Sequence, residues 1–425
     1  MTTNQDTASA GQPPSSSMLP LTEALERLLE YAVPLTEVEN VSTFDADGRV
    51  LARSVVSGLQ VPPHDNSSMD GYAVRVGNVV APGVELAVSQ RIPAGRFGEP
   101  LAAGSAARIF TGAPIPAGAD AVVPQEQADL LAGGARVRIN VVPQPGQWIR
   151  RAGEDVTRGA VVVKKGERLS PVSLGLAAGV GIAQLEVTRQ PRVALFSTGN
   201  ELVMPGAIQP AQLPPGAIYN SNRFFLAALL RRLGCAVQDF GSLPDRLGAI
   251  TLAIKSAARE HDLILTSGGV SEGEEDHVKP AVERLGTLDM WRLGIKPGKP
   301  FAYGRIAKAE GETTHFIGLP GNPVSSFVTF LLLVRPFLLR MQGARRLDVP
   351  ALELRADFDL PTPEVRREFL RARRNVQGGL ELFTNQSSGV LTSMHWADGL
   401  IDRPAGSVIA KGELVRFIPF VEWLA

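Results

Sequence analysis

The chain has almost no cysteine and few histidines, which narrows the chemistry that it can carry out. A single cysteine, Cys235, stands among 425 residues, so neither an intramolecular disulfide nor a cysteine-rich metal site can form. Its place after Leu233 and Gly234, where a helix is expected to end, favours a small buried side chain over a reactive thiol. The five histidines are scattered without the helical pairing of a zinc site, and we expect no zinc centre.

The chain also lacks an excess of either charge and a long apolar run. Lys plus Arg and Asp plus Glu number 43 each, which gives no electrostatic basis for nucleic acid or an anionic membrane as the main partner. The most apolar run, 324–334, stops before Arg335-Pro336, which is too short for a bilayer and suits a buried helix. The first 18 residues have neither the basic start nor the apolar core of a signal peptide and predict a disordered tail. We expect a cytoplasmic protein.

The middle of the chain has the pattern of an α/β domain. With 425 residues and 44% hydrophobic side chains, several packed domains can form. Short apolar runs alternate with helical patterns, which predicts a parallel α/β sheet covered on both faces, with ligands at the carboxyl ends of its strands. We expect strands at 192–196, 236–240 and 263–265, and helices at 223–233, 244–259 and 278–285.

Three loops of this region carry the groups expected at such a site. The first contains Gly268-Gly269, where the backbone can approach a ligand and free N–H groups favour phosphate. The other two, 295–300 and 318–323, follow expected strands and add lysines and prolines. Together they predict a site for a phosphorylated ligand and a hard metal ion at one edge of the sheet. The acids expected at this edge are Glu201, Asp245, Glu272, Glu274, Glu275 and Asp276.

The N-terminal part combines helical and loop patterns with a β-rich insertion. Residues 21–29 have helical spacing, and a second helical or turn segment is expected up to Leu51. The loop 61–73 holds Asp, Asn and Ser side chains that either cap a turn or contact a metal and ligand. Recurrent glycine and proline between residues 77 and 145 predict short strands. Thr111 either caps its own turn or serves the site, and 150–155 forms either a surface ion pair or a second metal or phosphate contact.

The C-terminal part predicts a small β domain, barrel-like in form. Arginines crowd one region of it, at positions 366, 367, 371, 373 and 374. Such alternation on a strand is typical of a solvated basic face, although the same charges would bind an anion if they faced the site. The expected strands are 352–358, 369–373, 380–383, 391–394, 407–410 and 415–418.

Several long motifs carry a family resemblance that covers the chain from about residue 19 to its end. They are DNSSMDGYAVR (65–75), IFTGAPIPAGADAVVPQE (109–126), IRRAGEDV (149–156), ALFSTGNEL (194–202), TSGGVSEGEED (266–276), IKPGKPFAYG (295–304) and GLPGNPVS (318–325). The sequence resembles the molybdopterin molybdenumtransferases, the MoeA and gephyrin E-domain family, which inserts molybdenum in molybdenum cofactor synthesis. The resemblance implies an elongated homodimer whose active cleft is shared between the α/β domain of one subunit and the β insertion of the other.

The resemblance also implies a domain order and a reaction. The domains are a tail (1–18), a discontinuous linker and dimerisation domain (19–57 and 152–189), an inserted β domain (58–151), an α/β molybdopterin-binding domain (190–343) and a C-terminal β-barrel (344–425). Adenylylated molybdopterin and molybdate, with Mg²⁺ as the divalent ion, would give molybdenum-molybdopterin and AMP. Cleaving a phosphoanhydride beside a dianionic oxyanion requires cations and hard oxygen ligands.

Site residues follow from the same resemblance. The implied catalytic residues are Asp70, Thr111 and Asp155 on the facing subunit, with Glu201, Asp245, Asp276 and Lys296 on the α/β domain. Glu201, Asp245 and Asp276 are the implied metal ligands. The implied contacts to pterin, phosphate or oxyanion are Ser267, Gly268, Gly269, Ser271, Lys299, Pro320, Asn322, Pro323, Arg371 and Ser387, with both prolines keeping their loop rigid.

Two other functions stay open. An adenylyltransferase acting one step earlier on the same pterin would share the α/β domain and its GGVS loop, but it would need neither β domain. A gephyrin-like scaffold depends on a partner for which the sequence carries no signal. We expect small-molecule substrates as the main partners. Contacts with other cofactor-synthesis proteins are compatible with this role, and we expect neither nucleic acid nor membrane binding.

Overall fold

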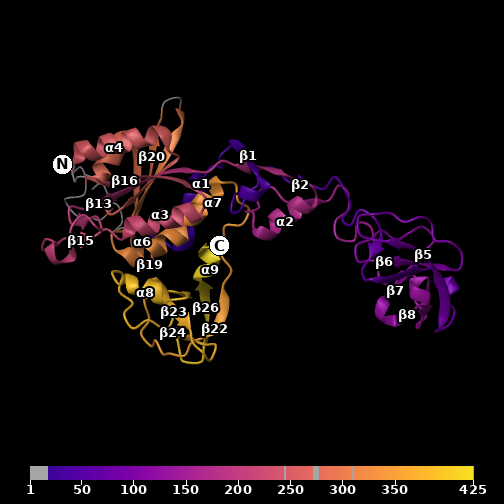
Figure 1. Cartoon of the computed structure of the whole chain (residues 1–425). Helices are drawn as coiled ribbons and strands as arrows, with labels where there is room; N and C mark the ends of the chain where they lie inside the picture. The colour runs from indigo at the N-terminus through magenta and orange to yellow at the C-terminus, as the bar shows by residue number, and fades with distance from the viewer. Residues whose placement is uncertain (1–17, 244–245, 271–276, 309–310, 425) are drawn as a thin grey trace, which may run out of the picture.

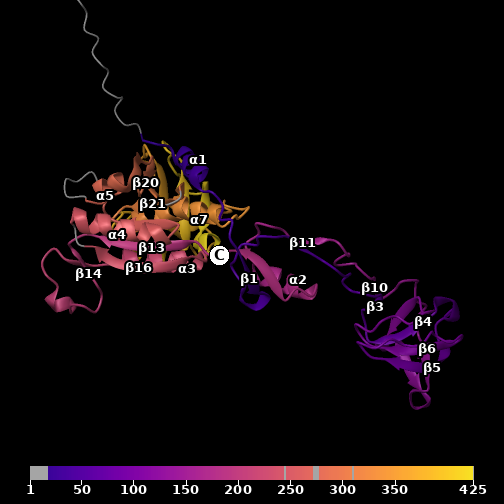
Figure 2. The ribbon, with the colours of Figure 1, turned by 90° about the horizontal axis from the view of Figure 1, so that it is seen from above.

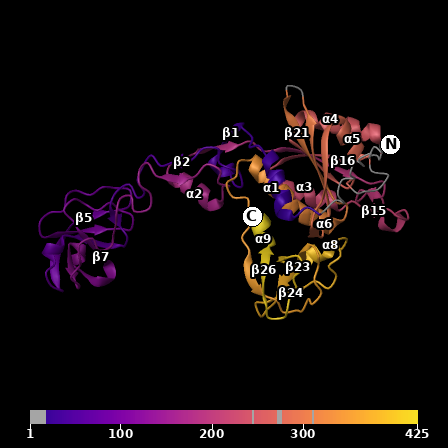
Figure 3. The ribbon, with the colours of Figure 1, turned by 180° about the vertical axis from the view of Figure 1, so that it is seen from behind.

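The computed structural model describes residues 18–243, 246–270, 277–308 and 311–424. The molecule is elongated, with the β-rich insertion at one end and the α/β sheet and C-terminal unit at the other (Figure 1). The views from above and from behind show the same separation (Figures 2 and 3). A narrow middle part of paired strands and helix α2 (Pro171–Gly179) joins the two ends.

The large end is organised around a mixed six-stranded sheet. Four strands run parallel as predicted, whereas β20 and β18 are antiparallel to their neighbours. The prediction of a parallel sheet is therefore wrong for β20 and β18, the last two strands of the sheet. Parallel neighbours need a long crossover, and β18, β20 and β21 follow one another through short connections instead. The strand order is β16 (Ala236–Leu243), β13 (Arg192–Thr198), β17 (Leu263–Ser267), β21 (Thr313–Leu319), β20 (Pro300–Ala307) and β18 (Gly286–Arg292).

Alternate side chains of the parallel strands enter two different cores. Leu195 and Leu265 pack on one face of the sheet, whereas Phe196 and Ile264 pack on the other. All four are buried, which is expected where helices cover both faces. The first face is covered by α1 (Leu21–Tyr31), α3 (Asn222–Arg232) and the long helix that begins at Pro323. The second face is covered by α4 (Leu247–Glu260) and α5 (Val278–Leu285).

The apolar run expected as a short buried helix extends through a proline. Helix α6 (Pro323–Thr329) continues as one π-helical turn, Phe330–Val334, into α7 (Arg335–Met341). The expected stop before Arg335-Pro336 is wrong, because a wider turn accommodates a residue that lacks an N–H and crowds a regular helix. Residues 323–341 have the length and composition of a membrane span, but 89% of their most apolar window is buried inside the protein.

The chain leaves the large end and returns to it as paired antiparallel strands. The pairs are β1 (Val38–Ser42) with β12 (Gln184–Thr188), β2 (Val55–Val56) with β11 (Val161–Val163), and β3 (Asn66–Ser67) with β10 (Ile149–Arg150). Helix α1 confirms the helical spacing at 21–29. The second helical or turn segment expected up to Leu51 is present as the 3₁₀ helix Thr43–Asp45 and the turn after it. Its first part forms β1 instead, because that strand pairs with residues far away in the sequence.

The insertion forms its own six-stranded sheet. The short strands expected between glycines are present, and positive-φ glycines such as Gly83, Gly104 and Gly118 lie in its turns. At Gly71 an added Cβ would lie 2.0 Å from the carbonyl oxygen of Val123, so only glycine fits. The strand order is β7 (Ala121–Pro124), β4 (Gly71–Val74), β6 (Ser105–Ile109), β5 (Val84–Ile92), β9 (Arg136–Ile139) and β8 (Ala128–Leu131).

The C-terminal residues form a second β unit beside the α/β sheet (Figure 1). Its strands pair along an open path, so a closed barrel stays a prediction. The run 391–394 was expected as a strand but lies in helix α8 (Leu391–Trp396), because four alternating residues are too few to distinguish the two periods. The path is β19 (Ile295–Lys296), β23 (Arg367–Arg374), β25 (Gly399–Arg403), β26 (Leu414–Pro419) and β22 (Leu352–Arg355), with β24 (Leu380–Leu382) on β23 and α9 (Phe420–Leu424) after β26.

His315 on β21 provides a prediction about pH and stability. Burial lowers the pKa of this imidazole from 6.5 to about 4, and its Nδ1 lies 3.0 Å from the Tyr303 hydroxyl. The contribution of neutral His315 to the free energy of unfolding is complete above pH 6.5 and should be lost as the pH falls toward 4. The full loss should be roughly 3 kcal/mol. His315→Asn cannot titrate, so its urea midpoint should change less across this pH range; an equal change in both proteins would contradict the assignment.

Candidate functional site

Strand register brings the predicted loops together at the carboxyl ends of the parallel strands, which are called the edge of the α/β sheet from here on. Ser197 of β13 lies opposite Ser267 of β17, and Ser267 lies opposite Leu319 of β21. The connection from β18 to β20, which carries Lys296 and Lys299, leaves the sheet at this same edge because β18 runs in the direction of β21. The ends of the three loops thus meet where the sequence placed them.

Backbone conformation and close packing require glycine at both positions of the turn after β17. Gly268 and Gly269 have φ of +90° and +71°, in the left-handed region where a side chain is strained. A Cβ on Gly268 would lie 2.7 Å from the carbonyl oxygen of Thr198, and one on Gly269 would lie 2.9 Å from the Thr198 hydroxyl. The ends of β13 and β17 are therefore packed too closely for a side chain at either position.

Asn222, at the start of α3, joins two of these loops. Its amide donates to the Ser267 hydroxyl at 2.8 Å and to the Gly321 carbonyl at 2.7 Å. The residue is 8% exposed, so an amide without these partners would be costly. The first turn of α3 receives its side-chain hydrogen bond from Asn220, whose Oδ1 accepts from the N–H of Arg223. The bridging role was missed because its carbonyl partner is 99 residues away.

Several buried hydroxyls have no hydrogen-bond partner among the described residues. A buried hydroxyl without a partner is uncommon and points to a ligand, ion or water. Thr198 lies beside the glycine turn, and Thr329 lies beneath the loop of Lys296, where a Cβ on Gly298 would come within 2.4 Å of its hydroxyl. The full set is Ser197, Thr198, Thr266, Ser326 and Thr329.

Of the three expected metal ligands, the structure describes only Glu201. Asp245 and Asp276 lie outside the described residues, as do Ser271 and residues 272–275. Glu201 is exposed, and its carboxylate lies over Gly199, where a Cβ would be 2.5 Å from Oε2. Within the described ranges no three His, Cys, Asp or Glu side chains form a metal-binding group. Mg²⁺ stays a prediction, for which carboxylate and hydroxyl oxygens are the appropriate donors.

Lys296 and Lys299, both expected to bind anions, have different surroundings. Lys296 Nζ lies 2.9 Å from Glu364 and 3.0 Å from Glu368. The hydrogen bond to Glu364, with that to Glu368, raises the pKa of the lysine, and the Lys296 ammonium lowers the pKa of Glu364. Lys299 is exposed, and its ammonium has no partner in the part of the chain that the structure describes.

The other predicted binding residues lie around the start of α6 and in the C-terminal unit. Pro320 is buried at the end of β21, Asn322 is the N-cap of α6, and Pro323 begins that helix. Ser387 is exposed in the C-terminal unit. The N–H of Val324 donates to the Ser388 carbonyl at 3.0 Å, so the start of α6 contacts this same loop. The proposed anion contacts of these residues stay predictions.

The arginine cluster is only partly the solvated basic face that its alternation suggested, since Arg373 and Arg374 are exposed but the other three are not. Arg371 is 1% exposed and donates to the Ser393 hydroxyl and to the carbonyls of Phe369 and Ser387. Burial lowers the pKa of its guanidinium to about 10. For Arg371 the prediction failed because its partners come from other strands and loops, which alternation within β23 does not reveal. The ion pairs are Arg366 with Glu364, Arg367 with Asp402, Arg373 with Glu381, and Arg374 with Asp398.

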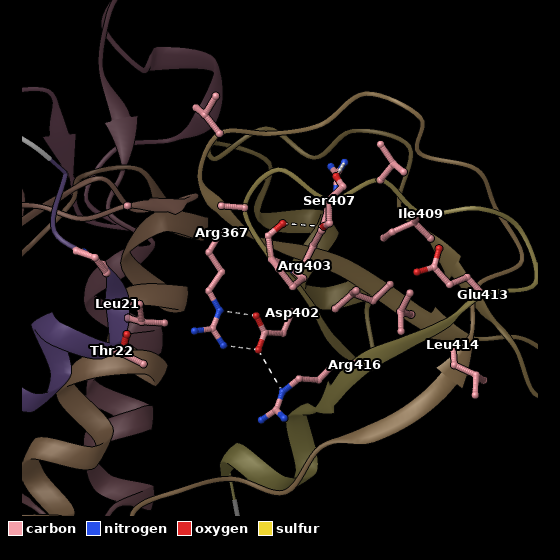
Figure 4. A pocket seen from close by; sticks show the side chains of 18 of the residues that line it. Leu21, Thr22, Arg367, Asp402, Arg403, Ser407, Ile409, Glu413, Leu414 and Arg416 are labelled. Carbon is pink, nitrogen blue, oxygen red and sulfur yellow. Dashed lines mark hydrogen bonds and ion pairs between the residues drawn. The ribbon is translucent and has the colours of Figure 1, made fainter.

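A cavity of about 980 Å³ lies between the start of α1 and the C-terminal sheet (Figure 4). Arg367 and Arg416 both contact Asp402 there, at 2.6 and 3.2 Å. Leu21 and Thr22 approach from α1. None of the predicted site residues lines this cavity, so the candidate site is a separate place.

In the insertion, Asp70 and Thr111 are joined directly. Asp70 Oδ1 accepts hydrogen bonds from the N–H and the hydroxyl of Thr111, both at 2.8 Å. These bonds lower the pKa of the Asp70 carboxyl. The Thr111 hydroxyl therefore orients a neighbouring carboxylate, and the simpler expectation that it caps its own turn is wrong.

The loops 61–73 and 150–155 are also tied together. Asp65 accepts from the N–H of Ala152 at 2.8 Å and from the Arg151 guanidinium at 2.6 Å, and these bonds lower its pKa. The ion-pair interpretation of 150–155 is therefore confirmed for Arg151. Asp155 is exposed, and its carboxylate has no partner among the described residues.

The two groups of predicted site residues lie far apart within one chain. Asp70 and Asp155 belong to the insertion and the arm that leads to it, whereas Glu201, Ser267 and Lys296 belong to the α/β end. The three views agree on this separation (Figures 1 to 3). A single chain therefore does not bring the whole predicted set together.

The bridge made by Asn222 can be tested by its effect on stability. Asn222→Ala removes two buried hydrogen bonds and leaves the Gly321 carbonyl without this donor, so the free energy of unfolding should fall by about 1 to 3 kcal/mol. Ser267→Ala removes one of the same bonds. In urea denaturation the double variant should lose less than the sum of the two single losses. Strictly additive losses would show that the two side chains do not share a bond.

Comparisons with known proteins cover nearly the whole chain. Residues 19–181 match the MoeA N-terminal region (domain I and II), residues 194–340 a probable molybdopterin binding domain, and residues 353–420 the MoeA C-terminal region (domain IV). A solved structure titled as a molybdopterin biosynthesis MoeA protein from Pyrococcus horikoshii is similar over 95% of this chain and 100% of its own, with 29% identity and a TM-score of 0.81.

Two curated relatives are informative. A Dictyostelium discoideum protein named gephyrin is 30% identical over 450 residues, which cover 95% of this chain and 62% of that protein. A Haemophilus influenzae protein named molybdopterin molybdenumtransferase is 40% identical over 411 residues, which cover 95% of this chain and 99% of that protein. With this identity over almost the full length of both proteins, the chain belongs to the molybdopterin molybdenumtransferase family.

Proposed function

We propose that this chain is the transferase that inserts molybdenum into molybdopterin, using adenylylated molybdopterin and molybdate and releasing AMP. The observation that carries the proposal is the edge of the α/β sheet, where the positive-φ turn Gly268-Gly269 lies against the Thr198 hydroxyl, which has no hydrogen-bond partner within the described ranges. Such a turn offers backbone donors to a phosphorylated ligand. The full-length similarity to the Haemophilus influenzae enzyme supports the same reaction.

The proposed reaction assigns a role to the donors, lysines and carboxylates at this edge. The N–H of Gly269, with the Ser267 and Thr198 hydroxyls, binds the phosphate oxygens, whereas the N–H of Gly268 donates to the Leu319 carbonyl and holds the turn in place. Lys296 and Lys299 offset the negative charge of molybdate and the phosphates, and they oppose the charge that develops as AMP leaves. Mg²⁺, when bound by Glu201 with Asp245 and Asp276, would supply Lewis-acid stabilisation of the same phosphate oxygens.

The proposed site needs a second chain. Asp70 and Thr111 are joined in the insertion, far from the glycine turn of their own chain (Figure 1). We therefore infer a homodimer in which the insertion of one protomer faces the α/β edge of its partner. Asp155, whose carboxylate is exposed, would lie on the same wall as Asp70. We also propose that the C-terminal domain is barrel-like, that the protein is cytoplasmic and that it contacts other cofactor-synthesis proteins.

Two alternatives predict different behaviour. An adenylyltransferase would form adenylylated molybdopterin and would need neither the insertion nor the C-terminal unit, both of which are well-formed sheets here. A scaffold is suggested only by the similarity to the protein named gephyrin, and it would bind ligands without turnover.

The direct test is release of AMP from adenylylated molybdopterin by the purified protein, with and without molybdate, at controlled Mg²⁺. We expect release that depends on molybdate. Asp70→Ala and Glu201→Ala should each reduce the rate by about 100-fold or more, because each removes a carboxylate from the proposed cleft. Asp348→Ala, at a carboxylate 80% exposed elsewhere, serves as the control and should keep full activity. Full activity in both cleft variants would refute this assignment.

A further inference from the structure

The Lys296 ammonium is paired with two carboxylates from a different part of the chain. Lys296 lies on β19, which follows the α/β strand β18 and pairs in parallel with β23 of the C-terminal unit. Its Nζ contacts Glu364 Oε2 at 2.9 Å and Glu368 Oε1 at 3.0 Å. Glu364 precedes β23, and Glu368 lies within it. A lysine proposed to hold an oxyanion therefore already holds two anions.

The two carboxylates differ in how firmly they are fixed. The Glu368 side chain is 6% exposed and also contacts Arg403, which is 3% exposed, at 2.8 Å. Moving Glu368 would leave a buried arginine without its counter-ion, which is strongly unfavourable. The Glu364 side chain is 18% exposed, and its other cation, Arg366, lies 3.6 Å away and is 25% exposed. Glu364 can therefore leave Lys296 at lower cost than Glu368 can.

An oxyanion and Glu364 compete for the same donors. An ammonium has three N–H groups, and the Nζ of Lys296, whose side chain is 40% exposed, lies within 3.0 Å of one oxygen of each carboxylate. A dianion placed beside both carboxylates would be repelled by two negative charges, whereas a dianion that replaces Glu364 faces only the charge of Glu368, which is also paired with Arg403. Lys299 has no such competitor among the described residues. The connection between β18 and β20 thus carries two different cations: Lys299, which has no carboxylate partner among the described residues, and Lys296, whose charge is masked by two carboxylates.

We propose that Glu364 is an internal counter-ion of the oxyanion subsite: it occupies Lys296 in the free protein and is displaced when molybdate binds. This inference rests on the proposed function, in which Lys296 contacts the oxyanion. Glu364 is a positioning residue that sets the molybdate concentration needed for binding. Once displaced, its carboxylate has Arg366 as a remaining partner, and the change is passed to the C-terminal unit because β19 is part of that sheet.

Removal of the Glu364 charge tests this competition. Glu364→Gln keeps the size of the side chain, so the affinity for molybdate, measured by calorimetry on the full-length protein, should rise about three- to tenfold. Glu364→Asp keeps the charge and should restore affinity close to that of the original protein. Glu381→Gln breaks a comparable pair with Arg373 in the same unit and should have no effect. In the AMP-release assay, the KM for molybdate should fall while kcat changes less than about twofold.

The possible outcomes separate this inference from the proposed function. Unchanged or weaker molybdate affinity in Glu364→Gln, with an unchanged Tm, would overturn the competition even if AMP release remains molybdate-dependent. Measurable binding by the variant alone would support it. Absence of binding by both proteins would remove the role of Lys296 as well. Tighter binding by the variant, without AMP release by the original protein, would support the competition and contradict the transferase.

Discussion

The paired strands that carry the chain out to the insertion and back are the constraint on which the rest of the structure depends. Three antiparallel pairs, β1–β12, β2–β11 and β3–β10, fix the direction of this arm. Backbone hydrogen bonds set each register, and the insertion lies away from the α/β sheet of its own chain (Figures 1 to 3). In the function that we propose, the Asp70–Thr111 pair and the glycine turn are two separate halves of the site, and a second chain would bring them together.

At the α/β edge, the capacity to bind anions is divided between free donors and occupied cations. Buried hydroxyls such as that of Thr198 have no hydrogen-bond partner among the described residues, and Lys299 is exposed, whereas Lys296 and Arg371 donate to groups of the protein itself. Backbone and hydroxyl donors recognise phosphate at fixed positions without adding net charge. Masked cations make nonspecific anion binding less favourable, so only a ligand with enough charge and the correct geometry recruits them.

Local patterns in the sequence predicted the parts of the fold that depend on periodicity. Helices α1, α3 and α4, the parallel strands and the glycine turn lie where apolar spacing and Gly268-Gly269 placed them. The antiparallel edge, the helix continuing through Pro336 and helix α8 were not predicted, because tertiary contacts decide them. In the site, the predicted strand ends gave the positions of the three loops. The bond from Asn222 to Gly321 joins residues 99 positions apart, and the pairing of Lys296 with Glu364 joins residues 68 positions apart, so no local pattern reveals either contact.

Subunit complementation tests the central claim that each site is built from two chains. Asp70→Ala and Glu201→Ala chains, carrying different affinity tags, would be co-expressed and the mixed dimers purified for the AMP-release assay. In a mixed dimer one cleft receives both changes and the other receives neither. The account therefore predicts about half the activity of the original dimer, although each variant alone is inactive. A mixed dimer as inactive as its parents would contradict a shared cleft, because a site within one chain would remain damaged in both protomers.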